Sequence, residues 1–96
     1  MNTTVNTTCI IDDDPIYIFG TKKIMEGLNF SKEFVVYKNG QEALDNLIPK
    51  INSGKDLPDV ILLDLNMPIL DGWQVLDQLI ELPMSYPIKI FIVSSS

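Results

Sequence analysis

Short apolar runs alternate along the chain with longer segments in which apolar residues recur every three or four positions. The runs predict strands at residues 7–12, 34–37, 59–64 and 88–93. The segments between them predict helices, and regular alternation of strands and helices is typical of a parallel sheet with helices on its faces. The expected architecture is therefore an α/β fold with the order β-α-β-α-β-α-β.

The first helix is expected to begin at Asp14-Pro15, because aspartate is a good N-cap and proline suits the first helical position. It is expected to end near Gly27 and Asn29. Residues at helical spacing predict its buried stripe, which consists of Tyr17, Thr21, Ile24 and Leu28.

The second and third helices are also marked by apolar residues at helical spacing. Pro49 is expected to end or kink the second helix near Ile48, and Asp71 is expected to cap the third, which residues 82–87 then break. The expected buried positions are Ala43, Leu44, Leu47, Ile48 and Ile51 in the second helix, and Val75, Leu76, Leu79 and Ile80 in the third.

The last apolar run, at residues 88–93, is too apolar for an exposed sheet edge, and no helix follows it. We therefore expect residues 1–96 to form a domain that is incomplete at its C-terminal side or is completed by another chain. Residues 1–6 are expected to be a polar tail.

Composition excludes several classes of function. The net charge of −6 argues against direct binding to nucleic acid or to an anionic membrane surface. The chain contains no histidine, which excludes Ser-His-Asp and Cys-His catalysis and histidine-ligated zinc. All seven basic residues are lysines, so arginine cannot provide bidentate recognition of phosphate.

Cys9 is the single cysteine of the chain, so no internal disulfide can form and a reducing, cytoplasmic setting is expected. Because it lies in an apolar run, we expect a small buried hydrophobic residue rather than a reactive thiol. No signal peptide is visible, and no apolar stretch approaches the roughly 18 residues that a membrane span needs.

Acidic or hydroxyl residues follow three of the predicted strands. Residues 12–14 are three aspartates, Asp64 ends the third apolar run, and Ser94 follows the last one. In a parallel α/β sheet these strand ends lie at one edge, where ligands bind. Clustered carboxylates suit a hard divalent cation such as Mg²⁺ together with a phosphoryl group. Asp14 and Asp71 are expected to act only as helix caps, and Gly72 as a packing or turn residue.

Three motifs resemble those of the receiver domains of two-component response regulators. They are Cys9–Pro15, Leu62–Gly72 and Phe91–Ser94, and the resemblance extends from about Thr7 to Ser96. It implies a flavodoxin-like, doubly wound parallel sheet of order 2-1-3-4 in this chain. The family's fifth strand, its last two helices and the invariant lysine of that strand have no counterpart in these residues. Lys89 cannot substitute, since it begins the fourth predicted strand, far from the crevice.

The resemblance also implies a role for each site residue. Asp64 becomes the phosphoacceptor, and Ser94 the switch hydroxyl. The Mg²⁺ ligands become Asp13, Asp64 and the backbone carbonyl of Asn66, with Asp12 acting through water. The implied phosphodonor is a sensor histidine kinase or a histidine phosphotransfer protein, and slow loss of the phosphoryl group resets the switch.

Two other functions fit these residues less well. A Mg²⁺-dependent phosphohydrolase with an aspartyl nucleophile usually carries a second acid two residues after the nucleophile, and that position is Asn66 here. A receiver-like module that only binds proteins is disfavoured because Asp12, Asp13, Asp64 and Ser94 are all present.

Overall fold

A computed structural model of the protein describes residues 4–67, 71–82 and 88–93. Its described strands form one parallel sheet of order β2-β1-β3-β4. The predicted α/β class and sheet order are thereby confirmed. The elements are β1 (Val5–Ile11), α1 (Pro15–Gly27), β2 (Ser31–Tyr37), α2 (Gly40–Ser53), β3 (Val60–Asp64), α3 (Gly72–Ile80) and β4 (Lys89–Val93).

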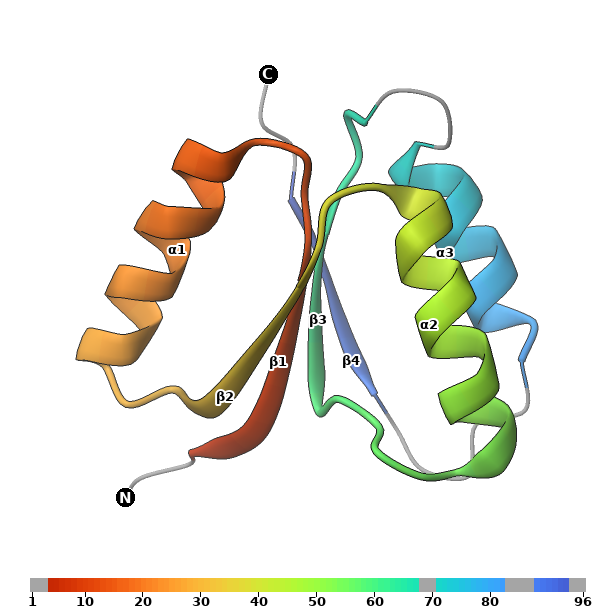
Figure 1. The fold of residues 1–96 in the computed structure, drawn as a ribbon, viewed down its shortest axis with the longest axis horizontal. Coiled ribbons are helices and arrows are strands. Elements are labelled where there is room, and N and C mark those ends of the chain that lie inside the picture. The colour runs from red at the N-terminus through yellow and green to blue at the C-terminus, as the bar shows by residue number, and fades with distance from the viewer. Residues whose placement is uncertain (1–3, 68–70, 83–87, 94–96) are drawn as a thin grey trace.

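Helices cover both faces of the sheet, with α1 on one side and α2 and α3 on the other (Figure 1). Because all the strands are parallel, their carboxyl ends meet at one edge, drawn at the top of the figure. The last residues of neighbouring strands pair with each other: Ile11 pairs with both Tyr37 and Leu63, and Asp64 pairs with Val93. Residues that follow β1 and β3 therefore emerge side by side.

The main core lies between the sheet and the pair α2 and α3. Strand residues alternate between the two faces, so that Cys9, Ile11, Ile61 and Leu63 all point into this core. Most of the residues predicted to be buried in α2 and α3 do lie in this core. They are Ala43, Leu44, Leu47, Ile51, Val75 and Leu79.

The predicted buried stripe of α1 is wrong at two of its four positions, and the other two, Tyr17 and Thr21, are half-buried. Ile18 is the buried residue of this helix, whereas Ile24 is 66% and Leu28 72% exposed. The four predicted positions do share one flank of the helix, but Ile18 sets the face that meets the sheet, and successive residues are turned by about 100°. Among the described residues no second helix lies on this side of the sheet to cover that flank (Figure 1).

Two details of the other helices also differ from prediction. α2 continues through Pro49 to Ser53, so an end of the helix near Ile48, one of the two predicted outcomes, is wrong. Pro49 is exposed, so water can solvate the carbonyl that lost its donor, and buried Ile51 anchors the turn that follows. In α3, Ile80 is 62% exposed rather than inward, because the helix ends there.

The first two strands are longer than predicted. β1 begins at Val5, inside the segment expected to be a polar tail, and β2 begins at Ser31. Val5 pairs with Ser31, and its N–H donates to the carbonyl of Phe30. Val5 is followed by polar Asn6, and β2 begins with polar Ser31, Lys32 and Glu33, so no apolar run marks these strand ends. The predicted break of the third helix falls mostly on residues 83–87, outside the described residues.

Candidate functional site

Three acidic residues meet at the carboxyl edge of the sheet. Asp12 and Asp13 directly follow β1, and Asp64 is the last residue of the neighbouring strand β3. One carboxylate oxygen from each lies within 4.8 Å of the other two. The structure therefore brings together three residues that the sequence placed in one crevice.

The three carboxylates differ in their exposure and in how they are held. Asp12 and Asp64 are 1% and 2% exposed, whereas Asp13 is open to solvent. Asp12 Oδ1 accepts a hydrogen bond of 2.9 Å from the N–H of Asp14, and Asp64 Oδ1 accepts one of 3.0 Å from the N–H of Asn66. Two carboxylates are thus fixed by the backbone that follows them, and the third, that of Asp13, is exposed to solvent.

Burial and neighbouring charge act together on Asp12. Burial raises the pKa of this carboxyl to about 6, and the negative charges of Asp64, Asp13 and Asp14 add to that effect. The hydrogen bond from the N–H of Asp14 opposes the shift. A cation among these oxygens would relieve the repulsion, and carboxylate oxygens are the ligands that hard divalent cations prefer. The donor set therefore fits Mg²⁺.

The other two acids near the site are helix caps, as predicted. Asp14 Oδ1 accepts from the N–H groups of Ile16 and Tyr17 at 3.0 and 3.4 Å, which caps α1. Asp71 Oδ1 accepts from the N–H of Gln74 at 3.0 Å. The side chain of Gln74 in turn accepts from the N–H of Asp71 at 2.9 Å, and this completes a capping box at α3.

The other residues that the sequence analysis considered for the site are not part of the carboxylate cluster. Asn66 is an exposed residue two positions beyond Asp64, and the metal-binding role of its carbonyl stays a prediction. Ser94 lies outside the described residues. Lys89 begins β4, pairs with Val60, and donates its N–H to the carbonyl of Asp59. It therefore lies at the amino ends of the strands, far from the carboxylates, as predicted.

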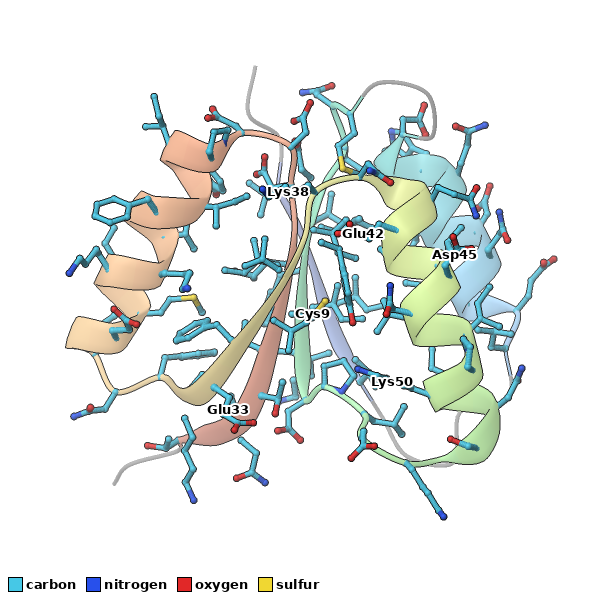
Figure 2. All side chains as sticks on the ribbon, in the orientation of Figure 1. Cys9, Glu33, Lys38, Glu42, Asp45 and Lys50 are labelled. Atoms are coloured by element: carbon cyan, nitrogen blue, oxygen red, sulfur yellow. The ribbon has the colours of Figure 1, made fainter. Side chains whose placement is uncertain are left out.

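Cys9 lies inside the main core, well below the edge that carries the carboxylates (Figure 2). Burial raises the pKa of its thiol to about 12, against a smaller opposite effect of Lys50. The thiol is therefore protonated at neutral pH and inert. The expectation of a small buried hydrophobic residue is confirmed, and Cys9 has no part in the site.

Gly72 has a closer relation to the site than its sequence position revealed. Its N–H donates to the carbonyl of Leu65 at 3.2 Å, which places the first turn of α3 against the end of β3. The sequence identified Gly72 only as a packing or turn residue. The Asp-Gly pair at 71–72 was the available signal, but it does not specify which backbone the glycine contacts.

Comparison with known proteins agrees with this geometry. Residues 8–96 match the response regulator receiver domain. The chain belongs to the response regulator receiver family. It is 34% identical over 92 residues to the nitrate/nitrite response regulator NarL of Escherichia coli K12, with 93% of this chain and 38% of that protein covered. It is 35% identical over 88 residues to the transcriptional regulator DegU of Brevibacillus brevis, covering 88% and 33% of the two chains.

Solved receiver structures show the same fold. The bacteriophytochrome response regulator AtBRR superposes with a TM-score of 0.80 at 29% identity, covering 98% of this chain and 69% of its own. The phosphorylated cyanobacterial phytochrome response regulator RcpA gives 0.80 at 26% identity, covering 97% and 67%. The receiver chain thus spans less than two fifths of the length of NarL and DegU, and about two thirds of these solved chains.

The family membership makes this chain a receiver domain of two-component signalling. The described part of this receiver contains no helix that is long and apolar enough to cross a membrane.

Proposed function

We propose that this receiver is a phosphorylatable switch in which Asp64 accepts a phosphoryl group from a phosphohistidine. The donor is a sensor histidine kinase or a histidine phosphotransfer protein. One observation carries the proposal: Asp64 ends β3 with its carboxylate within 4.8 Å of those of Asp12 and Asp13. Three carboxylates this close together repel one another. A cation bound between them offsets this repulsion and can also bind an incoming phosphoryl group.

The transfer needs only this carboxylate as the nucleophile. An oxygen of Asp64 forms a bond to phosphorus while the bond between phosphorus and the donor's imidazole nitrogen breaks. The electron pair of that bond stays with the imidazole. Resetting follows when water attacks the phosphorus of the acyl phosphate, which releases inorganic phosphate and restores the carboxylate.

The residues around Asp64 divide the remaining tasks. Asp13, Asp64 and the carbonyl of Asn66 would bind Mg²⁺ directly, and buried Asp12 would act through a water. When bound, Mg²⁺ offsets the repulsion between the carboxylates and the anionic phosphoryl oxygens. The turn that follows Asp64 keeps its carboxylate oriented through the N–H of Asn66. Ser94 would donate a hydrogen bond to a phosphoryl oxygen in the switched state.

The function as a switch also sets the expected partners. The chain carries a net charge of −6, so direct binding to nucleic acid is unfavourable and the immediate partners are proteins. We place the protein in the cytoplasm, where histidine kinases present their phosphorylated domains. The chemistry of the receiver itself would be phosphorylation from a donor and slow loss of that group.

Phosphorylation confined to Asp64 is the direct test. The protein is incubated with Mg²⁺ and either acetyl phosphate or phosphoramidate, which carries the same phosphorus–nitrogen bond as phosphohistidine. Intact-protein mass spectrometry should show one added phosphoryl group that is labile to hydroxylamine, as an acyl phosphate is. Asp64→Asn should show none.

Asp71→Asn is the matched control, because asparagine also caps helices and Asp71 is the cap of α3. It should be phosphorylated like the unchanged protein. Recovery of the phosphoryl group on Asp12, Asp13 or a serine, or a modified Asp64→Asn protein, would contradict the proposed phosphoacceptor.

A further inference from the structure

Gly72, the first residue of α3, lies directly against the end of the strand that carries Asp64. A Cβ atom at this position would stand 2.6 Å from Leu65 Cα and 2.9 Å from the carbonyl carbon of Asp64, and closer still to the carbonyl oxygen of Asp64. All three atoms belong to the backbone. No side-chain rotation can therefore make room, and either the turn after β3 or the helix would have to move.

A glycine is needed at position 72 because a side chain has no space there, and not because of the backbone conformation. Among the described glycines a positive φ occurs at Gly54, not at Gly72. Gly20, in the middle of α1, provides the contrast, because a Cβ added there would meet nothing within 4 Å. An alanine is therefore expected to be tolerated at Gly20, whereas an alanine at position 72 would collide with the backbone of Asp64 and Leu65.

This close approach supports the turn that orients the candidate site. The N–H of Gly72 donates to the carbonyl of Leu65, and the N–H of Leu65 donates to the carbonyl of Val93 at 3.1 Å. The next residue, Asn66, donates its N–H to the carboxylate of Asp64. The turn from Asp64 to Asn66 is thus held between α3 and β4.

The helix itself cannot retreat easily from this contact. Its first turn is closed by the capping box of Asp71 and Gln74. Its inner side chains, Val75 and Leu79, are both fully buried in the main core. Displacing α3 would open that core, so a Cβ at position 72 would displace the turn instead.

We infer that Gly72 is a positioning residue for the phosphorylation site. Its missing side chain lets α3 approach the backbone of Asp64 and Leu65 closely, and this contact holds the turn that orients the Asp64 carboxylate toward Asp12 and Asp13. The inference rests on the proposed function for its consequence, the loss of phosphoryl transfer. Its structural part, the loss of a cation site, can be measured separately.

The experiment introduces Gly72→Ala into a protein that already carries Gly20→Ala, because alanine in an open helix interior offsets lost stability. The affinity for Mg²⁺ alone is measured by following backbone amide NMR shifts, without any phosphodonor. We expect Gly72→Ala to remain folded but to bind Mg²⁺ at least about tenfold more weakly than the Gly20→Ala parent. Phosphorylation of Asp64 by acetyl phosphate should slow by a similar factor.

Val75→Ala in the same parent is the matched control. It loosens α3 in the core but leaves the contact of Gly72 with the turn in place, so the folded protein should keep the Mg²⁺ affinity of the parent. An affinity for Gly72→Ala within twofold of the parent would overturn the inference, as would an equal loss in Val75→Ala. Loss of folding in Gly72→Ala would also overturn it, since the glycine would then determine stability and not position.

Failure of the inference and failure of the proposed function are distinguishable. If the Gly20→Ala parent takes no phosphoryl group on Asp64, the proposed function is wrong, whatever the Mg²⁺ comparison shows. If the parent is phosphorylated and Gly72→Ala is phosphorylated equally fast, only the positioning role is wrong.

Discussion

Asp12 carries a carboxylate that is almost fully removed from solvent and is surrounded by acids. It is 1% exposed, and one carboxylate oxygen of it lies within 4.8 Å of those of Asp13 and Asp64. The backbone N–H of Asp14 donates a hydrogen bond to this carboxylate. Such a group stabilises the folded state when protonated and destabilises it when ionised, because burial and like charges both penalise the anion.

This arrangement predicts an unusual pH dependence of stability in the absence of a divalent cation. The pKa of Asp12 rises from 3.8 to about 6 on folding. The folded state therefore binds more protons than the unfolded state between these values, and the contribution of Asp12 to stability is lost as pH rises through about 6. Urea unfolding in EDTA should show Asp12→Asn gaining stability over the unchanged protein between pH 4 and 7.5, by roughly 2–3 kcal/mol.

Asp14→Asn is the control for this measurement, since it removes a neighbouring charge and keeps a residue suited to the cap of α1. Its stability relative to the unchanged protein should change much less over the same pH range. If the difference in the free energy of unfolding between Asp12→Asn and the unchanged protein stays constant with pH, folding does not raise the pKa of Asp12.

Asp13 is expected to matter for cation binding and not for folding. It is exposed, whereas its two partners are buried, so its carboxylate gains little from the fold and adds repulsion. Asp13→Ala should therefore bind Mg²⁺ at least about tenfold more weakly and unfold at an equal or higher urea concentration in EDTA. Isothermal titration calorimetry gives the affinity, and unchanged affinity would refute its role as a ligand.

At the scale of residues, the sequence was enough to place the acidic cluster but not the contact that shapes it. Asp12, Asp13 and Asp64 each follow an apolar run, and parallel strands necessarily bring such residues to one edge. The closeness of Gly72 to the backbone of Asp64 depends on the position of α3 to within an ångström, and no pattern of residue types encodes that. The role of Ser94 stays a prediction, because it lies outside the described residues.

At the scale of elements, periodicity predicted each helix and strand but not always the face that is buried. For α2 and α3 the apolar stripe coincides with the core, because both helices pack on the same side of the sheet and against each other. For α1 the stripe and the buried face differ. A helix that packs on a sheet alone is oriented by few contacts, and here Ile18 decides them.

Pro49 shows that tertiary packing can override a local preference. It lies inside α2, where it removes one backbone hydrogen bond, yet the helix continues because Leu47 and Ile51 are buried on either side of it. Pro49→Ala should restore that bond and stabilise the protein by about 1 kcal/mol or more, reduced by the greater freedom of the unfolded chain. Urea unfolding monitored by circular dichroism measures the change.

Pro15 is the matched control for this substitution. It occupies the first position of α1, where its missing N–H would have had no partner within the helix. Pro15→Ala should therefore leave stability unchanged or slightly lower it. If both substitutions shift the unfolding midpoint equally, the effect comes from the unfolded chain and not from the interior of α2.

At the scale of the whole molecule, the two faces of the sheet are covered unequally. α2 and α3 bury one face in a continuous core, whereas α1 is the only helix of the described residues on the other face (Figure 1). Ile90 is partly buried against the main core, so its neighbour Phe91 points to the α1 side of the sheet, where it is 49% exposed. Ile24 and Leu28 on the outer flank of α1 are also exposed.

This exposed apolar surface predicts that the 96-residue chain associates with itself. β4 is an edge strand of the described sheet with an exposed apolar side chain on each face, Phe91 and Ile92, and exposed apolar side chains beside an open edge favour contact between molecules. Sedimentation velocity should show a mass that rises with protein concentration. Phe91→Lys should keep the protein monomeric at every concentration, because a charge on an edge strand opposes pairing and a half-exposed side chain contributes little to folding.

Ile16→Lys is the control for this prediction. Ile16 is 81% exposed near the start of α1, on the side of that helix away from the sheet, so the variant should associate like the unchanged chain. A monomeric unchanged chain, or equal association of all three proteins, would show that the exposed apolar surface around β4 does not drive contact.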